Sequence, residues 1–126
     1  MAKILVVDDE HDIQTLFEQH FRREIKLDEI QFVFSFSGEE ALTYINQHEQ
    51  EAVLILSDIN MPGMSGLELL KHIKEKYRKP PPVVMMITAY GDDDNYRTAM
   101  KLGADDFLTK PLDFKLLKEK LKNSIL

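Results

Sequence analysis

Three uniformly apolar runs recur along the chain, at residues 4–7, 53–56 and 83–87. They lack the polar–apolar alternation of a half-exposed strand, so they are typical of strands buried on both faces. Residues 31–36 nearly alternate and predict a strand at the outside of a sheet, and residues 106–109 predict a short last strand. The pattern therefore predicts five strands.

An amphipathic helix is predicted after each strand, because apolar residues return at helical spacing. Ser37 and Ser65 each stand three residues before a glutamate, a capping-box pattern that opens the second and third helices. Asp92 to Asp94 place negative charge at the start of the fourth helix, and Gly103 suits its end. The residues expected to face inward are Ile13, Leu16, Phe17 and Phe21; Ala41, Leu42 and Ile45; Leu69, Leu70, Ile73 and Tyr77; and Phe114, Leu117, Leu121 and Ile125.

Strict strand–helix alternation with buried strands predicts the α/β class, with right-handed crossovers between parallel strands. The count fits a five-stranded parallel doubly wound sheet of order 2-1-3-4-5, the flavodoxin-like arrangement. Residues 1–126 are expected to form a single domain, since this length suffices for one core.

Composition removes several classes of function. The chain has no cysteine, which excludes disulfides and thiolate chemistry, and its four histidines show no ligand spacing. A net charge of −6 argues against direct binding of nucleic acid. No apolar run approaches the roughly 20 residues that span a bilayer, and the first strand leaves no room for a signal peptide. A cytoplasmic location is the expectation.

The predicted sheet brings distant side chains to one edge, because parallel strands end on the same side. Asp8 and Asp9 follow the first strand, Asp58 ends the third, Thr88 the fourth, and Lys110 the fifth. Asp58 by itself could merely cap a turn. Three crowded carboxylates, however, call for a hard divalent cation, and Mg²⁺ fits best. An acid, Mg²⁺, a lysine and a hydroxyl are the parts that hold a transferring phosphoryl group.

Over its whole length the sequence resembles the receiver domain of the bacterial response-regulator family, which acts in two-component phosphorelay signalling. The resemblance rests on Asp8-Asp9, on Asp58 followed by Met61-Pro62-Gly63, on Thr88-Ala89 and on Lys110-Pro111.

The resemblance implies that Asp58 is the phosphoacceptor, which takes the phosphoryl group from a phosphohistidine of a sensor histidine kinase or a histidine phosphotransfer protein. It also implies a Mg²⁺ site beside Asp58, in which Asp9 binds the ion directly, Asp8 binds it through a water, and Asn60 offers its backbone carbonyl. The domain is then a signalling module and no enzyme, apart from its own phosphotransfer and autodephosphorylation.

Further roles follow from the same resemblance. Lys110 pairs with phosphoryl oxygens, Thr88 donates its hydroxyl to one of them, and the Lys110–Pro111 bond is cis. Phe107 matches the switch aromatic, which moves inward with Thr88 and alters the face of the fourth helix, fifth strand and fifth helix. Asn60 and Tyr90 match positions that tune the lifetime of the phosphoryl group.

The downstream partner stays open: it is either a separate protein or a C-terminal output domain, with phosphorylation-dependent homodimerisation as a further option. Four lysines of the last helix form either a solvated face or a docking surface for an acidic partner. They are Lys115, Lys118, Lys120 and Lys122.

Three alternative functions fit less well. A phosphohydrolase of the haloacid-dehalogenase type needs an acid where Asn60 stands, and a cap domain for which no residues remain. A flavodoxin-like cofactor module needs a phosphate-binding loop where the chain has Asp8, Asp9 and Glu10. A receiver that folds but is not phosphorylated is the third alternative.

Overall fold

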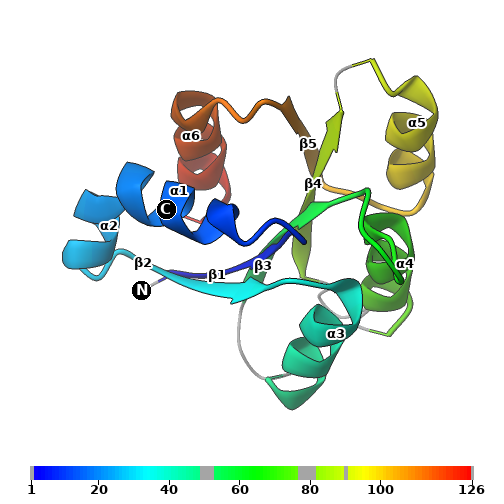
Figure 1. Cartoon of the computed structure of the whole chain (residues 1–126), viewed down its shortest axis with the longest axis horizontal. Coiled ribbons are helices and arrows are strands. Elements are labelled where there is room, and N and C mark those ends of the chain that lie inside the picture. The colour runs from blue at the N-terminus through cyan, green and yellow to red at the C-terminus, as the bar shows by residue number, and fades with distance from the viewer. Residues whose placement is uncertain (1, 49–52, 77–81, 90, 126) are drawn as a thin grey trace.

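Five parallel strands form one sheet in the order β2-β1-β3-β4-β5, in a computed structural model that describes residues 2–48, 53–76, 82–89 and 91–125 (Figure 1). The strands are β1 (Ala2–Val7), β2 (Ile30–Ser35), β3 (Val53–Asp58), β4 (Val83–Ala89) and β5 (Asp106–Lys110). The helices are α1 (Asp12–His20), α2 (Arg22–Lys26), α3 (Gly38–Gln47), α4 (Gly66–Lys76), α5 (Asp93–Lys101) and α6 (Phe114–Ile125). The predicted class, strand order and five parallel strands are confirmed.

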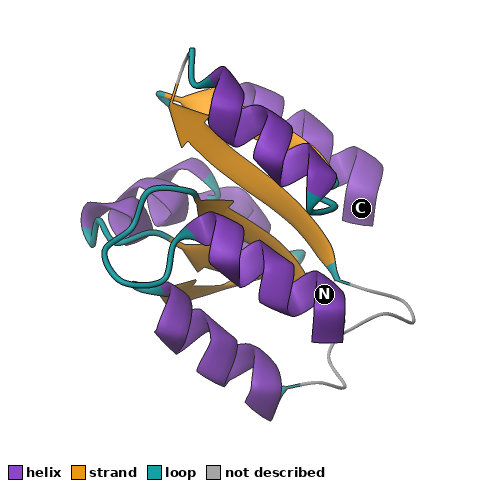
Figure 2. Cartoon of the chain, turned by 90° about the vertical axis from the view of Figure 1, so that its right-hand side faces the viewer, coloured by secondary structure: helices purple, strands orange, loops and turns teal. Residues whose placement is uncertain are grey.

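Helices cover both faces of the sheet, as Figure 2 shows. Successive side chains of a strand point to opposite faces, so β1 supplies Leu5 and Val7 to one core layer and Ile4 and Val6 to the other. The first layer packs against α3, α4 and α5, and the second against α1 and α6. This two-sided burial explains why the central strands are uniformly apolar.

The predicted helix starts are confirmed by their caps. Ser37 Oγ accepts a hydrogen bond from the backbone N–H three residues later at 3.0 Å, and Ser65 Oγ does the same at 3.2 Å. Asp92 Oδ1 makes the equivalent contact at 3.3 Å. Gly103 has φ 97°, a left-handed conformation that glycine adopts at low cost. Each side-chain cap stabilises its helix by about 1 kcal/mol.

The segment between β1 and β2 differs from the prediction of one helix. It contains α1 and a second, short helix, α2. The inward stripe consists of Ile13, Phe17 and Phe21, four residues apart and all buried, whereas Leu16 is 43% exposed. Leu16 is turned by about 100° from Phe17 around the helix axis, which places it outside that stripe. The prediction that Leu16 faces inward is therefore wrong.

The short helix α2 is fastened to α6. Lys118 Nζ lies 3.2 Å from Glu24 Oε2 and 5.2 Å from the centre of the Phe21 ring.

A second lysine of α6 contacts β5. Lys120 Nζ donates to both carboxylate oxygens of Asp106 at 2.9 Å. Two of the four lysines on the last helix thus make contacts within the domain.

The remaining inward predictions hold for the described side chains of α3 and α4, with Ala41, Leu69, Leu70 and Ile73 fully buried. Tyr77 and the side chain of Ile125 lie outside the described residues. Across the described ranges, none of the helices has the length and hydropathy needed to cross a bilayer.

Candidate functional site

The predicted polar residues meet at one edge of the sheet, where the carboxyl ends of β1, β3, β4 and β5 lie. Asp8 and Asp9 directly follow β1, and Asp58 is the last residue of β3. Thr88 is the second-to-last residue of β4, and Lys110 ends β5. Hydrogen bonding between the parallel strands fixes these ends at the same level, so the side chains meet although they are up to about a hundred residues apart in sequence.

The three carboxylates form a cluster that could hold a metal ion. One oxygen from each of Asp8, Asp9 and Asp58 lies within 4.8 Å of the others. Asp8 and Asp58 are buried, at 1% and 5% exposure. Carboxylate oxygens in this number suit a hard divalent cation, which would also neutralise their mutual repulsion.

Burial raises the pKa of Asp8, and the neighbouring charge of Asp58 raises it further. The backbone N–H of Glu10, which donates to Asp8 Oδ1 at 2.9 Å, and the charge of Lys110 work in the opposite direction. Ionised Asp8 is therefore destabilising unless a cation balances it.

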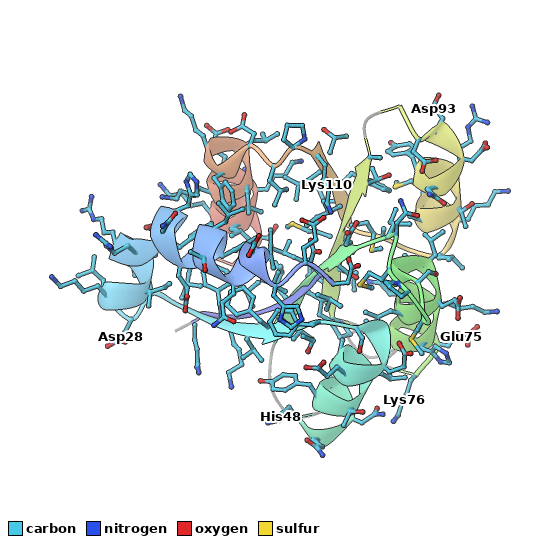
Figure 3. The ribbon with its side chains drawn as sticks, viewed as in Figure 1. Asp28, His48, Glu75, Lys76, Asp93 and Lys110 are labelled. Carbon is cyan, nitrogen blue, oxygen red and sulfur yellow. The ribbon has the colours of Figure 1, made fainter. Side chains whose placement is uncertain are left out.

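Lys110 supplies a fixed positive charge to the cluster. Its Nζ donates to Asp58 Oδ2 at 2.7 Å and lies 3.6 Å from Asp8 Oδ2. Burial lowers the pKa of Lys110, but its hydrogen bond to Asp58 and the charges of Asp58 and Asp8 outweigh burial and raise it overall. The Lys110–Pro111 peptide bond is cis, and Figure 3 shows Lys110 where β5 ends.

Thr88 carries a buried hydroxyl without a partner. The residue is 3% exposed, and in the described part of the chain its Oγ1 is a buried side-chain atom that makes no hydrogen bond. Such a group costs about 1–3 kcal/mol when it is left unsatisfied. Thr88 thus has a donor available for an acceptor that enters the site.

Two of the other predicted site residues, Asn60 and Phe107, lie within the described ranges. Asn60 is exposed, two residues after the end of β3. Phe107 is half-buried on β5 and its ring centre lies 4.4 Å from that of Tyr96 on α5. Tyr90 lies outside the described residues. The contact with Tyr96 could not be read from the sequence, since α5 and β5 are joined by a turn of unknown geometry.

Gly66 positions the helix that follows the site. Its N–H donates to the carbonyl oxygen of Ile59 at 2.8 Å. A Cβ atom on Gly66 would lie 2.0 Å from the carbonyl oxygen of Asp58, so a side chain would force α4 away from the end of β3. The sequence offered only a weak signal, a glycine just inside a capping box.

The loop between β3 and α4 is held by the start of α3. Glu39 Oε1 accepts a hydrogen bond from the backbone N–H of Met64 at 3.2 Å. Gly63 has φ 72°, and a Cβ there would lie 2.7 Å from Glu39 Oε2. No sequence signal pointed to Glu39, because the contact spans 25 residues.

Comparison with known proteins identifies a family that the chain matches over most of its length. The sequence model of the response regulator receiver domain matches residues 4–122. The chain is 40% identical over 117 residues to the response regulator protein PilR of Pseudomonas aeruginosa. The aligned residues make up 93% of this chain and 24% of PilR.

Solved structures agree with this match. A response regulator receiver domain protein from Clostridium thermocellum superposes with a TM-score of 0.84 at 30% identity, covering 99% of this chain and 94% of the other. NtrX from Brucella abortus gives a TM-score of 0.82 at 31% identity, covering 99% of this chain and 27% of NtrX. The chain thus spans about a quarter of the length of PilR and of NtrX.

The fold, the polar cluster at its sheet edge and the match over residues 4–122 lead to one assignment: the chain belongs to the family of response regulator receiver domains of two-component signalling systems.

Proposed function

We propose that Asp58 is the phosphoacceptor of this receiver domain. The observation that carries the proposal is the contact of 2.7 Å between Lys110 Nζ and Asp58 Oδ2, within a cluster of three carboxylates. A carboxylate at the end of a central strand, beside a fixed cation and a metal-binding cluster, has the surroundings that phosphoryl transfer requires. The donor is a phosphohistidine on a kinase or a histidine phosphotransfer protein.

In this transfer the phosphoryl group passes from the donor imidazole to Asp58. A carboxylate oxygen of Asp58 attacks the phosphorus atom, an O–P bond forms, and the P–N bond to the donor imidazole breaks. The electron pair of the broken bond remains on the imidazole nitrogen. Lys110, already beside Asp58, pairs with the phosphoryl oxygens. Thr88 donates its unpartnered hydroxyl to one of them, so the charge of the new phosphoryl group is met by two groups of this chain.

The acidic cluster fits Mg²⁺, which supplies positive charge to the phosphoryl oxygens when it is bound. Asp9 and Asp58 offer carboxylate oxygens to the ion, Asp8 holds a bound water, and Asn60 offers its carbonyl. The raised pKa of Asp8 supports this assignment, because a buried carboxylate with a carboxylate neighbour gains from a cation.

We further propose that phosphorylation is transmitted through Thr88 and Phe107 to the face formed by α5, β5 and α6. Movement of Thr88 toward the phosphoryl group opens space for the half-buried Phe107 ring, which now packs against Tyr96. The altered face then regulates a downstream protein or an output domain, or supports a phosphorylation-dependent homodimer. Asn60 and Tyr90 set how long the phosphoryl group persists.

Incubation with Mg²⁺ and acetyl phosphate, followed by intact-protein mass spectrometry, tests the proposal. We expect a gain of one phosphoryl group that is lost in Asp58→Asn and in a metal-free sample. Asp12→Asn, which removes an exposed carboxylate from α1, is the matched control and should be labelled like the wild type. Labelling of Asp58→Asn to the wild-type level would refute the assignment of Asp58. Absence of labelling with acetyl phosphate and with a histidine kinase, together with no binding of the phosphoryl mimic beryllofluoride, would instead indicate a receiver that signals by binding alone.

A further inference from the structure

A hollow of about 390 Å³ lies beside the outer strand β2, away from the acidic cluster. In Figure 3, Asp28 marks this side of the molecule, and Lys110 lies over the middle of the sheet. The hollow is lined by Glu18 of α1, Ile25 of α2, Asp28 of the turn after α2, and Gln31, Phe32 and Phe34 of β2. Its volume is at the lower end of the range of about 300–1,000 Å³ that is common for ligand pockets.

Two charged residues line the hollow, Glu18 and Asp28, and both are acidic. Glu18 and Asp28 are exposed, and no side-chain hydrogen bond or ion pair joins either carboxylate to another described residue. The rings of Phe32 and Phe34 are half-buried at the floor. Carboxylates attract a cation directly, and aromatic rings attract it through their faces. The lining therefore suits the ammonium or guanidinium group of a lysine or arginine side chain.

The strand beside the hollow is an open edge of the sheet. Among the described strands, β2 pairs only with β1. Its sequence from Ile30 to Ser35 contains no charged residue and no proline, the features that usually protect such an edge. The opposite edge differs: β5 contains Asp106 and Lys110, and Asp106 is bound by Lys120. Of the two edges, β2 is the one suited to accept a further strand.

We propose that the β2 edge and the adjoining hollow bind an extended segment of a partner polypeptide that carries a lysine or arginine side chain. The main chain of this segment pairs with β2, and its cation lies between Glu18 and Asp28 above the phenylalanine rings. A second copy of the chain fits less well, because β2 has no basic residue to place in either hollow and each copy carries a net charge of −6. This binding does not depend on phosphorylation of Asp58.

Titration of the ¹⁵N-labelled chain with a five-residue peptide of alternating isoleucine and arginine, blocked at both ends, tests the proposal. We expect saturable shifts of backbone amides in β2 and at Asp28. The double variant Glu18→Gln/Asp28→Asn should weaken binding about tenfold. Asparagine tolerates the left-handed conformation of Asp28 (φ 56°), so the fold should be retained. The matched control, Glu40→Gln/Glu119→Gln, removes two exposed carboxylates from α3 and α6 and should bind like the wild type.

Several results would overturn the proposal. The first is the absence of saturable shifts at about 1 mM peptide. The second is equal binding of a peptide in which neutral citrulline replaces arginine, or equal weakening by the control variant, because either result would show that the two carboxylates do not recognise the cation. The third is concentration-dependent broadening of β2 amides without peptide, which would assign the edge to a second copy of the chain. Asp58→Asn should leave peptide binding unchanged, which separates this test from that of the phosphoacceptor.

Discussion

Replacement of Asp8 by asparagine should stabilise the metal-free domain at neutral pH. Asp8 is 1% exposed, and one of its oxygens lies within 4.8 Å of oxygens of Asp9 and Asp58. At an effective dielectric constant of about 20, two unit charges at 4.8 Å repel by about 3.5 kcal/mol. The attraction of Asp8 to Lys110 at 3.6 Å is about 4.6 kcal/mol on the same scale, which more than cancels one such repulsion but not both.

The remaining repulsion adds to the cost of burying the carboxylate, and burial is the largest cause of the raised pKa of Asp8. Asparagine keeps an oxygen that can accept the N–H of Glu10, so this hydrogen bond is retained. We expect Asp8→Asn to raise the free energy of unfolding by about 1–2 kcal/mol. For a domain of this size the melting temperature should rise by about 3–10 °C.

The pH dependence follows from the raised pKa of Asp8. The folded state binds the Asp8 proton more tightly than the unfolded state, whose pKa is near the ordinary value of 3.8. Between this value and the raised pKa of the folded state, stability falls as pH rises, and above that window the full cost is present. The advantage of Asp8→Asn should therefore be complete above the raised pKa of folded Asp8 and disappear below about pH 3.8.

Thermal denaturation in the presence of a chelator measures this effect, with Glu119→Gln as a control that removes an exposed carboxylate from α6. Addition of Mg²⁺ at about ten times its dissociation constant should stabilise the wild type by about 1.4 kcal/mol and Asp8→Asn by less. A lower melting temperature for metal-free Asp8→Asn at pH 7 would refute the reasoning, because it would mean that the ionised carboxylate stabilises the fold without a metal.

Three other substitutions test separate features. Gly66→Ala should destabilise the domain by more than about 2 kcal/mol in urea denaturation, because the new Cβ would lie 2.0 Å from the carbonyl oxygen of Asp58; a change below 0.5 kcal/mol, the roughly neutral range of surface substitutions, would contradict this packing. Lys74→Met removes the ammonium that donates to Asp105 Oδ2 at 2.8 Å and to the carbonyl oxygen of Pro82 at 3.0 Å, and it should cost about 1 kcal/mol by the same assay. An unchanged midpoint would show that these two contacts contribute nothing. Tyr90→Ala should shorten the lifetime of the phosphorylated protein if Tyr90 shields the phosphoryl group from water, and an unchanged dephosphorylation rate would exclude that role.

Local pattern was sufficient to predict the strands, and the count of alternating strands and helices fitted the order 2-1-3-4-5 that the sheet has. Residues 4–7, 53–56 and 83–87 are apolar throughout because helices cover both faces of the central strands. The same pattern failed at Leu16, since helical spacing alone does not tell how wide a stripe the neighbouring elements cover. It also missed the break between α1 and α2.

The sequence by itself determined that Asp8, Asp9, Asp58, Thr88 and Lys110 share one edge, because parallel strands must end on the same side. Only the tertiary structure decided how these groups contact one another. The hydrogen bond between Lys110 and Asp58, the unpartnered hydroxyl of Thr88 and the raised pKa of Asp8 depend on side-chain distances and burial.

The contacts that support this edge also belong to the tertiary structure alone. The approach of Gly66 to Asp58 and the bond of Glu39 to the loop after β3 join elements that are separate in sequence. Away from this edge, the hollow beside β2 is likewise formed by residues of separate elements, α1, α2 and β2. Periodicity reports which face of an element is buried, whereas these contacts depend on the distance and angle at which two elements meet. That geometry is set by the packing of the whole core.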